Sequence, residues 1–221
     1  RYISKAVKLY MEIPNCVLVF AKSRTLIEAT GHITYDKVNS SLPGQMDGNR
    51  LFLDYPSGHA FPYITCLIEV QHAQEVNFYR KDILSLDWES LLKLIINRNV
   101  GYINEYPATY RRHAMNSTKA LSVDRMMVNR EFIEEPYEYA RESGAFTQRQ
   151  LDRWKHRMLK RYFIKQLVRC IVLEQTKVRH DLYKEIERLY PKVLRSIKRD
   201  IRYRLFRRLY KHKVLVRFVF K

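Results

Sequence analysis

The chain has 221 residues, of which 46% are hydrophobic and 13% aromatic, with only 6 glycines and 7 prolines. This composition excludes a disordered tail and is typical of an ordered protein that buries a core. The formal net charge of +18 comes entirely from residues 149–221, which contain 24 basic and 6 acidic residues, whereas residues 1–148 contain 17 of each. Such segregation favours an anionic partner over charge acquired only for solubility.

Cysteine usage and hydropathy limit the compartment. The three cysteines, Cys16, Cys66 and Cys170, are odd in number and far apart, which is typical of a reducing environment rather than a disulfide framework. The longest uninterrupted apolar run, residues 16–21, is far shorter than the roughly 20 residues that cross a bilayer. We therefore expect no transmembrane segment.

Residues 1–84 are expected to form a small mixed α/β globular part. Apolar, β-branched and aromatic residues predict strands at Cys16–Phe20, Leu51–Asp54 and Tyr63–Val70. Stretches rich in Gly, Pro and Ser separate them, as at residues 40–48. The pattern therefore predicts a small sheet.

Residues 85–146 are expected to form a helical part that packs on the globular part formed by residues 1–84. Asp87 is a good N-cap for a helix over residues 88–96, with Gly101 just beyond its end. Residues 102–122 have an irregular pattern, and two shorter helices are predicted at Asp124–Glu135 and Pro136–Ser143.

Residues 147–221 are expected to form a basic helical extension. Thr147 and Gln150 match a capping box, and apolar residues then recur at helical spacing up to Pro191, which predicts one rod of roughly 60 Å. A second helix is predicted over Val193–Tyr210, and the tail Val214–Phe220 is β-prone.

The second predicted helix has two different sides. At about 100° per residue, an aliphatic stripe that should pack on protein comprises Leu194, Ile197, Ile201, Leu205 and Leu209. Tyr203 and Tyr210 lie roughly opposite it, Phe206 near its flank, and arginines stand among these rings. Guanidinium groups bind phosphate and aromatic rings stack on unpaired bases, so this side favours structured RNA over duplex DNA.

The predicted RNA-binding residues combine these rings with the cations of both helices. They are Arg153, Lys155, Arg157, Lys160, Arg161, Arg195, Lys198, Arg199, Arg202, Tyr203, Arg204, Phe206, Arg207, Arg208, Tyr210, Lys211 and Lys213.

Three other interpretations of this segment remain open. The charge could belong to an ordinary solvated face, or the aromatic residues could complete the core of a helix buried on all sides in a large assembly. A basic amphipathic helix on an anionic membrane is the third, although it should place its large aromatic residues on the apolar side.

Catalytic and metal-binding patterns are missing from the sequence. The glycines form neither G-x-x-x-x-G-K-[ST] nor G-x-G-x-x-G, and the seven histidines lack zinc-site spacing. Asp54, Ser57 and His59 stand close together, but their segment is first a turn. A helical series of glutamates alternates with arginines and predicts a solvated, salt-bridged face; it comprises Glu131, Glu134, Glu135, Glu138 and Glu142. We expect no enzyme activity, cofactor, metal or small-molecule substrate.

A neutral globular body with a long basic helical extension resembles a ribosomal protein in architecture, although no motif carries the likeness. The sequence thus predicts a structural component of a ribonucleoprotein that binds rRNA or other structured RNA beside neighbouring proteins. A mitochondrial ribosome is favoured, because the chain begins at Arg1 without Met and shows no familiar universal ribosomal motif. The alternative is a non-catalytic accessory subunit of an organellar membrane complex.

Overall fold

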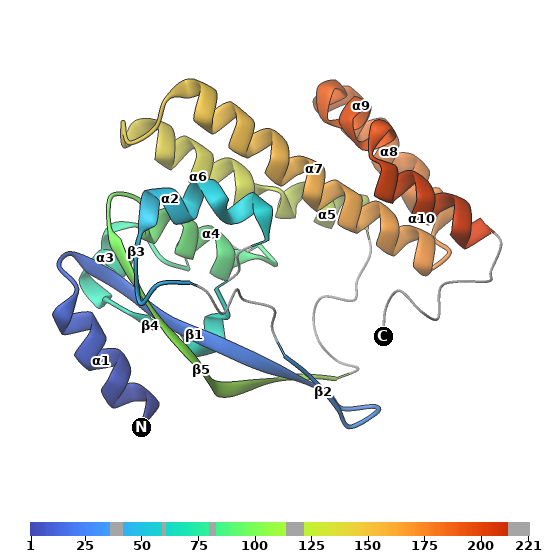
Figure 1. Cartoon of the computed structure of the whole chain (residues 1–221). Coiled ribbons are helices and arrows are strands. Elements are labelled where there is room, and N and C mark those ends of the chain that lie inside the picture. The colour runs from blue at the N-terminus through green and yellow to red at the C-terminus, as the bar shows by residue number, and fades with distance from the viewer. Residues whose placement is uncertain (36–41, 59–60, 80–82, 114–121, 212–221) are drawn as a thin grey trace. The chain divides into compact units, whose positions relative to one another are not determined.

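The computed structural model describes residues 1–35, 42–58, 61–79, 83–113 and 122–211. The chain forms two units. The sheet unit comprises Arg1–Lys119 and Glu131–Asp152, and the helical unit comprises Ala120–Arg130 and Arg153–Lys221. An N-terminal curled, mixed sheet is followed by a mostly helical C-terminal half (Figure 1). The predicted fold class, α+β and predominantly helical with a small β-containing N-terminal part, is confirmed.

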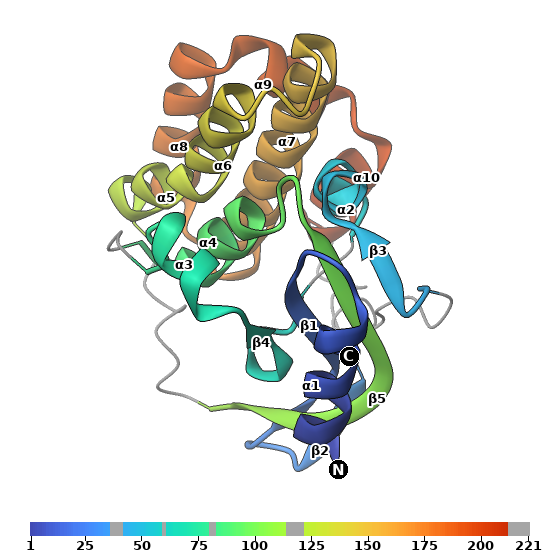
Figure 2. The same cartoon turned by 90° about the vertical axis from the view of Figure 1, so that its left-hand side faces the viewer.

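Two long parallel strands form the centre of the sheet. Strand β1 (Cys16–Ile27) pairs with β5 (Asn99–Arg112) along its whole length, and Figure 2 shows the two side by side. The hairpin strand β2 (His32–Tyr35) and the short β4 (Leu67–Ile68) pair antiparallel with β1, and β3 (Gln45–Asp47) pairs antiparallel with β5.

The first eight residues of β1 are all buried, as expected for a strand covered on both faces. Helix α1 (Tyr2–Glu12) packs on one face, where Ala6 lies against Val19 in a small core cluster. A Cβ at Gly101 would lie 3.0 Å from Val19 Cγ2, so a larger residue there would require the neighbouring side chains to shift. On the other face, the ring of Phe20 lies 5.3 Å from that of Phe61.

Short helices complete the sheet unit. They are α2 (Gly48–Asp54), the 3-10 helices Tyr55–Ser57 and Tyr63–Thr65, α3 (Val70–Glu75), α4 (Leu86–Leu94) and α6 (Glu131–Glu142). Helices α4 and α6 pack together. Gly48 is required at the start of α2, because a Cβ there would lie 1.9 Å from the carbonyl oxygen of Ile95.

The helical unit contains α5 (Val123–Asn129), most of α7 (Gln148–Val172), α8 (Thr176–Leu189), α9 (Pro191–Arg199) and α10 (Ile201–Lys211). Polar contacts fix its segments within an apolar core. The hydroxyl of Tyr162 donates to the carbonyl oxygen of Met126 at 2.7 Å, and Arg130 Nε donates to the hydroxyl of Tyr190 at 2.8 Å. Helix α8 buries Leu182 and Ile186 completely.

The predicted capping box is confirmed at the start of α7. Thr147 N donates to Gln150 Oε1 at 2.8 Å, and Gln150 N donates back to Thr147 Oγ1 at 3.3 Å. These reciprocal bonds satisfy two backbone donors that have no partner within the helix.

Several element predictions for the sheet unit are wrong. Residues 51–54 are helical because Asp47 caps α2, accepting from Arg50 N at 2.7 Å. Only residues 67–68 of the predicted strand Tyr63–Val70 pair in the sheet. Residues 102–112, predicted to be irregular, lie in β5, which is paired along β1. The helix predicted over residues 88–96 is present as α4, but it begins at Leu86 after the N-cap Ser85, so the prediction of Asp87 as its N-cap is wrong.

The predicted helix boundaries in the C-terminal half also change. The single rod up to Pro191 is wrong, because α7 ends at Val172 and Glu174 adopts φ +53° before α8 begins. The second predicted helix is interrupted at Asp200, whose backbone is extended (φ −67°, ψ +116°). Pro136 lies inside α6 and does not begin a helix. The tail Val214–Phe220 lies outside the described residues.

Candidate nucleic-acid interface

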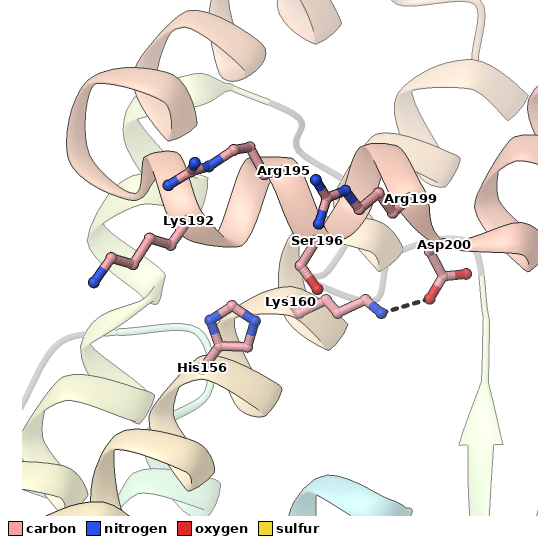
Figure 3. Close-up of a pocket in the computed structure, with 7 residues that line it drawn as sticks. All are labelled: His156, Lys160, Lys192, Arg195, Ser196, Arg199 and Asp200. Atoms are coloured by element: carbon pink, nitrogen blue, oxygen red, sulfur yellow. Dashed lines mark ion pairs between the residues drawn. The ribbon is translucent and has the colours of Figure 1, made fainter.

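A basic pocket of about 400 Å³ lies in the helical unit, between α7 and α9. Figure 3 shows the side chains that line it: His156, Lys160, Lys192, Arg195, Ser196, Arg199 and Asp200. The sequence analysis predicted Lys160, Arg195 and Arg199 as RNA-binding residues, and the structure brings these three together at one hollow.

The amphipathic pattern of α9 turns its polar side chains toward the pocket. Residues 192, 195, 196 and 199 recur at the i, i+3, i+4, i+7 spacing of one helix face. On the other side of the helix, Val193, Leu194 and Ile197 are buried. Burial of that apolar side therefore fixes the rotation of α9 and presents the basic side. On α7, His156 and Lys160 are one turn apart, so they share a face.

Positive charge exceeds negative charge in the pocket. Of the described residues that line it, only Asp200 is acidic, and its carboxylate lies 2.7 Å from Lys160 Nζ. Within the described part of the chain, the remaining cations Lys192, Arg195 and Arg199 form no ion pair or hydrogen bond through their side chains. At neutral pH the pocket thus presents three positive charges that no neighbouring carboxylate compensates.

Two residues that line the pocket have shifted pKa values. The hydrogen bond from Lys160 lowers the pKa of Asp200, so its carboxylate stays ionised. Burial, with the positive charge of Lys160 as a second cause, lowers the pKa of His156. His156 is consequently neutral at pH 7, and a bound anion would favour its protonated form.

Asp200 also organises the backbone beside the pocket. Its Oδ1 accepts from Tyr203 N at 3.2 Å, and its carbonyl oxygen accepts from Arg204 N at 2.9 Å. These bonds cap the start of α10. The same carboxylate thus pairs with Lys160 of the pocket and redirects the chain from α9 into α10.

The predicted cation and aromatic face of the second helix is wrong at Tyr203. Tyr203 is only 2% exposed and its hydroxyl is hydrogen-bonded to that of Tyr183. Burial and this neighbour raise the pKa of Tyr203. Conversely, Ile201 and Leu205, predicted to pack in the aliphatic stripe, are 77% and 54% exposed. The break at Asp200 ends the helical phase that had placed these residues on one stripe with Ile197.

The other predicted RNA-binding residues are distributed over three helices. On α10, Phe206 stacks on Tyr210 with 6.0 Å between ring centroids, and Tyr210 donates a hydrogen bond to the carbonyl oxygen of Val172 at 3.1 Å. Lys198 lies 3.7 Å from Glu187. The side chain of Lys211, on α10, and all of Lys213 lie outside what the structure describes. Lys155, on α7, is half-buried, and the exposed ones among the predicted residues of α7 and α10 are Arg153, Arg157, Arg161, Arg202, Arg204, Arg207 and Arg208.

His156, Lys192 and Ser196 line the pocket but were not predicted from the sequence. The spacing of Lys192 and Ser196 relative to Arg195 and Arg199 was a signal that could have identified both, because all four fall on one helix face. His156 had no comparable signal, since its place in the pocket depends on how α7 packs against α9.

Other candidate sites gain no support. Among the described residues, no group of three or more His, Cys, Asp or Glu side chains could hold a metal ion. Asp54 lies 3.8 Å from Arg50, Ser57 is exposed in a 3-10 helix, and His59 is outside the described residues. In the same described part, no helix is both long and apolar enough to cross a membrane.

No family model, curated protein or solved structure matches this chain.

Proposed function

We propose that this protein is a structural RNA-binding component of a ribonucleoprotein and that the basic pocket of its helical unit binds backbone phosphate. The observation that carries the proposal is the set of three uncompensated cations, Lys192, Arg195 and Arg199, on one face of α9 beside a hollow. An anion bound at this point would supply their counter-charge.

The residue types suit a phosphate group. A guanidinium group binds two phosphate oxygens through a planar fork, and the lysine ammonium adds a compact charge. Arg195 and Arg199 provide two such forks one turn apart, and the hydroxyl of Ser196 lies between them as a further donor. His156 can add a charge when it is protonated.

A polyanion fits better than a small phosphorylated molecule. Exposed cations continue beyond the pocket along α7, as at Arg153, and along α10, as at Arg202 and Arg208. A single small ligand could not reach all of them, whereas an RNA backbone presents a phosphate at each nucleotide. Because these contacts are to phosphate, they position the protein on RNA with little reading of sequence.

The proposal extends to a ribosome as the particle, because a neutral sheet unit joined to a strongly basic helical unit resembles ribosomal proteins in architecture. rRNA and neighbouring proteins are then the partners, the mitochondrial matrix is the proposed compartment, and the role is structural rather than catalytic.

The test compares two triple variants of the full chain in RNA binding across a salt series. Replacing Lys192, Arg195 and Arg199 by Gln should make the slope of log K against log salt shallower by about two to three units if each cation neutralises one phosphate. The control variant replaces Lys5, Lys8 and Arg50 by Gln. It removes the same charge, but each of these cations already has a carboxylate partner, at Glu105, Glu12 and Asp54 respectively.

The control variant should retain the parent's salt slope. An equal change of slope in both triple variants would show a general effect of net charge and would remove the assignment of the pocket. Binding to vesicles of anionic lipid without binding to RNA would replace the proposal by the membrane-complex alternative.

A further inference from the structure

A second group of charged and aromatic side chains lies in the sheet unit, far along the sequence from the basic pocket. It stands on one face of the β2–β1–β5 sheet and comprises Lys22, Arg24, Tyr35 and Tyr106, which we call the tyrosine face. Residues 1–148 have no net charge, so the charge distribution alone would not have pointed to it.

Strand register and ring contacts place these four side chains together. Arg24 pairs with Tyr35 across β1 and β2, so both point to the same side. The rings of Tyr35 and Tyr106 meet edge to face with centroids 5.1 Å apart, and Lys22 Nζ lies 4.3 Å from the centroid of Tyr106. Alternation along β1 sends Thr25 to the opposite face, together with its register partner Tyr110.

The two cations, Lys22 and Arg24, are partly withdrawn from water, and no described carboxylate pairs with them. Lys22 is only 8% exposed, and its ammonium contacts the ring of Tyr106 but no carboxylate among the described residues. The Nε of Arg24 is buried and has no hydrogen-bond acceptor within the described part of the chain. Burying a charge or a donor without a partner is unfavourable, and the contact with an aromatic ring offsets only part of the cost for lysine. An anion bound beside these two side chains would supply the missing partner.

Tyr35 adds a different kind of contact. It is 57% exposed although its ring is held against Tyr106. An exposed ring fixed in orientation on a sheet is a platform on which an unpaired base stacks. The spacing of Tyr35 directly opposite Arg24 puts a base site beside a phosphate site, as successive parts of one nucleotide require.

We propose that the tyrosine face binds a single-stranded segment of RNA, with phosphate at Lys22 and Arg24 and a base stacked on Tyr35. This inference rests on the proposed function for the class of ligand, but it concerns residues that the basic pocket does not share. A phosphorylated peptide would use the cations and would leave the exposed ring without a partner, which is why RNA is favoured.

The test measures binding of a fluorescent single-stranded oligouridylate to the full chain in a salt series. Tyr35→Leu should weaken binding by about 5- to 100-fold with little change in the salt slope, whereas Tyr35→Phe, which keeps the ring, should bind like the parent. Arg24→Gln should make the slope shallower by about 0.7. The matched controls are Tyr110→Leu and Arg112→Gln on the opposite face of the same strands, and both should bind like the parent.

An oligomer of abasic nucleotides separates base from phosphate. Parent and Tyr35→Leu should bind it equally, and a parent that binds it as tightly as oligouridylate would overturn the base contact. Equal losses in Tyr35→Leu and Tyr110→Leu, or a loss in Tyr35→Phe, would overturn the tyrosine face. If Tyr35→Leu lowers the thermal midpoint of unfolding, its weaker binding could come from lost stability. The salt slope of Arg24→Gln, compared with that of Arg112→Gln, then tests the phosphate contact by itself.

The same series distinguishes this inference from the proposed function. In the background of the triple Gln variant of the basic pocket, Tyr35→Leu should still weaken binding by the same factor as in the parent. If that triple variant binds as the parent does while Tyr35→Leu weakens binding, the pocket assignment fails and the tyrosine face stands. If the triple variant alone weakens binding, the pocket stands and the tyrosine face is wrong.

Discussion

Helices α9 and α10 follow each other in the chain and are both rich in arginine and lysine, but they bury different kinds of side chain. In α9 the aliphatic residues, such as Ile197, are buried and the cations line a pocket. In α10 the aliphatic residues Ile201 and Leu205 are exposed, and Tyr203 is buried. Apolar spacing therefore predicts a buried stripe only while the helix continues, and here the helix stops at Asp200.

The largest expected effect tests which aliphatic side chains form the core. Ile197→Ala should lower the free energy of unfolding by about 2–5 kcal/mol, because it leaves a cavity at a fully buried position. Leu205→Ala, on the exposed side of α10, should change it by no more than about 0.5 kcal/mol. Urea unfolding of both variants measures the difference, and equal losses would restore the single stripe that the sequence predicted.

The next effect concerns the two tyrosines that the sequence placed on one RNA-binding face. Tyr203→Leu should lower the free energy of unfolding by about 1–3 kcal/mol, since it leaves the hydroxyl of Tyr183 without its partner. The folded variant should bind RNA like the parent. Tyr210→Leu, at the partly exposed ring stacked on Phe206, should instead weaken RNA binding. Titrations of RNA at a temperature where both variants are folded would contradict the structure if Tyr203→Leu showed the larger loss.

A smaller effect is expected at the break between the two helices. Asp200→Asn keeps an N-cap side chain for α10 but removes the ion pair with Lys160, which should cost roughly 0.2–1 kcal/mol of stability at pH 7. The folded-state pKa of Asp200 is lowered by Lys160, so its contribution is present above the unfolded pKa and is lost as the pH falls through the folded pKa. The difference in stability between parent and variant should accordingly vanish in acid, as thermal melts across pH would show.

The same substitution should tighten RNA binding, because it removes the carboxylate that lines the pocket. A variant that is less stable but binds RNA more tightly separates the two roles of Asp200. Weaker binding by a folded Asp200→Asn protein would mean that the carboxylate orients Lys160 toward the ligand.

Features of the fold that depend on local chemistry could be predicted from the sequence. The capping box at Thr147, the presence of helix α4 and the start of β1 at Cys16 all have their causes within a few residues. Strand β5 could not be found in this way, because its partner β1 lies about 80 residues earlier and its own pattern contains Gly101, Pro107 and several charges. Pairing across that separation determines the strand.

The helix breaks escaped prediction for a related reason. Neither Glu174, with its positive φ, nor the extended Asp200 is a glycine or proline, and the apolar spacing runs on through both positions. At the candidate site, charge segregation was enough to point to Arg195 and Arg199, but the approach of α7 that adds His156 is a tertiary contact. The burial of Tyr203 likewise depends on Tyr183 of the neighbouring helix α8.

A dependence of RNA binding on pH is also expected, and it comes from α7 and not from α9 or α10. Burial and the charge of Lys160 lower the pKa of His156, so the free pocket holds this side chain neutral at pH 7. A phosphate bound in the pocket would face His156 and the four cations Lys160, Lys192, Arg195 and Arg199. Its negative charge opposes the lowering of the His156 pKa and favours the imidazolium. Binding therefore takes up a proton, and affinity should rise by up to about tenfold as the pH falls from about 7.5 to 5.5, since one pKa unit corresponds to a factor of ten.

His156→Gln should remove this rise, whereas His180→Gln, at an exposed position on α8, should retain it. The lowered pKa has the opposite consequence for the free protein: protonation of His156 is harder in the folded state, so stability falls below the unfolded pKa of about 6.5. Parent affinity and parent stability should consequently move in opposite directions on acidification, and only the affinity change requires RNA. If His156→Gln and the parent share one pH profile for binding, the proton is taken up elsewhere and His156 does not face the phosphate.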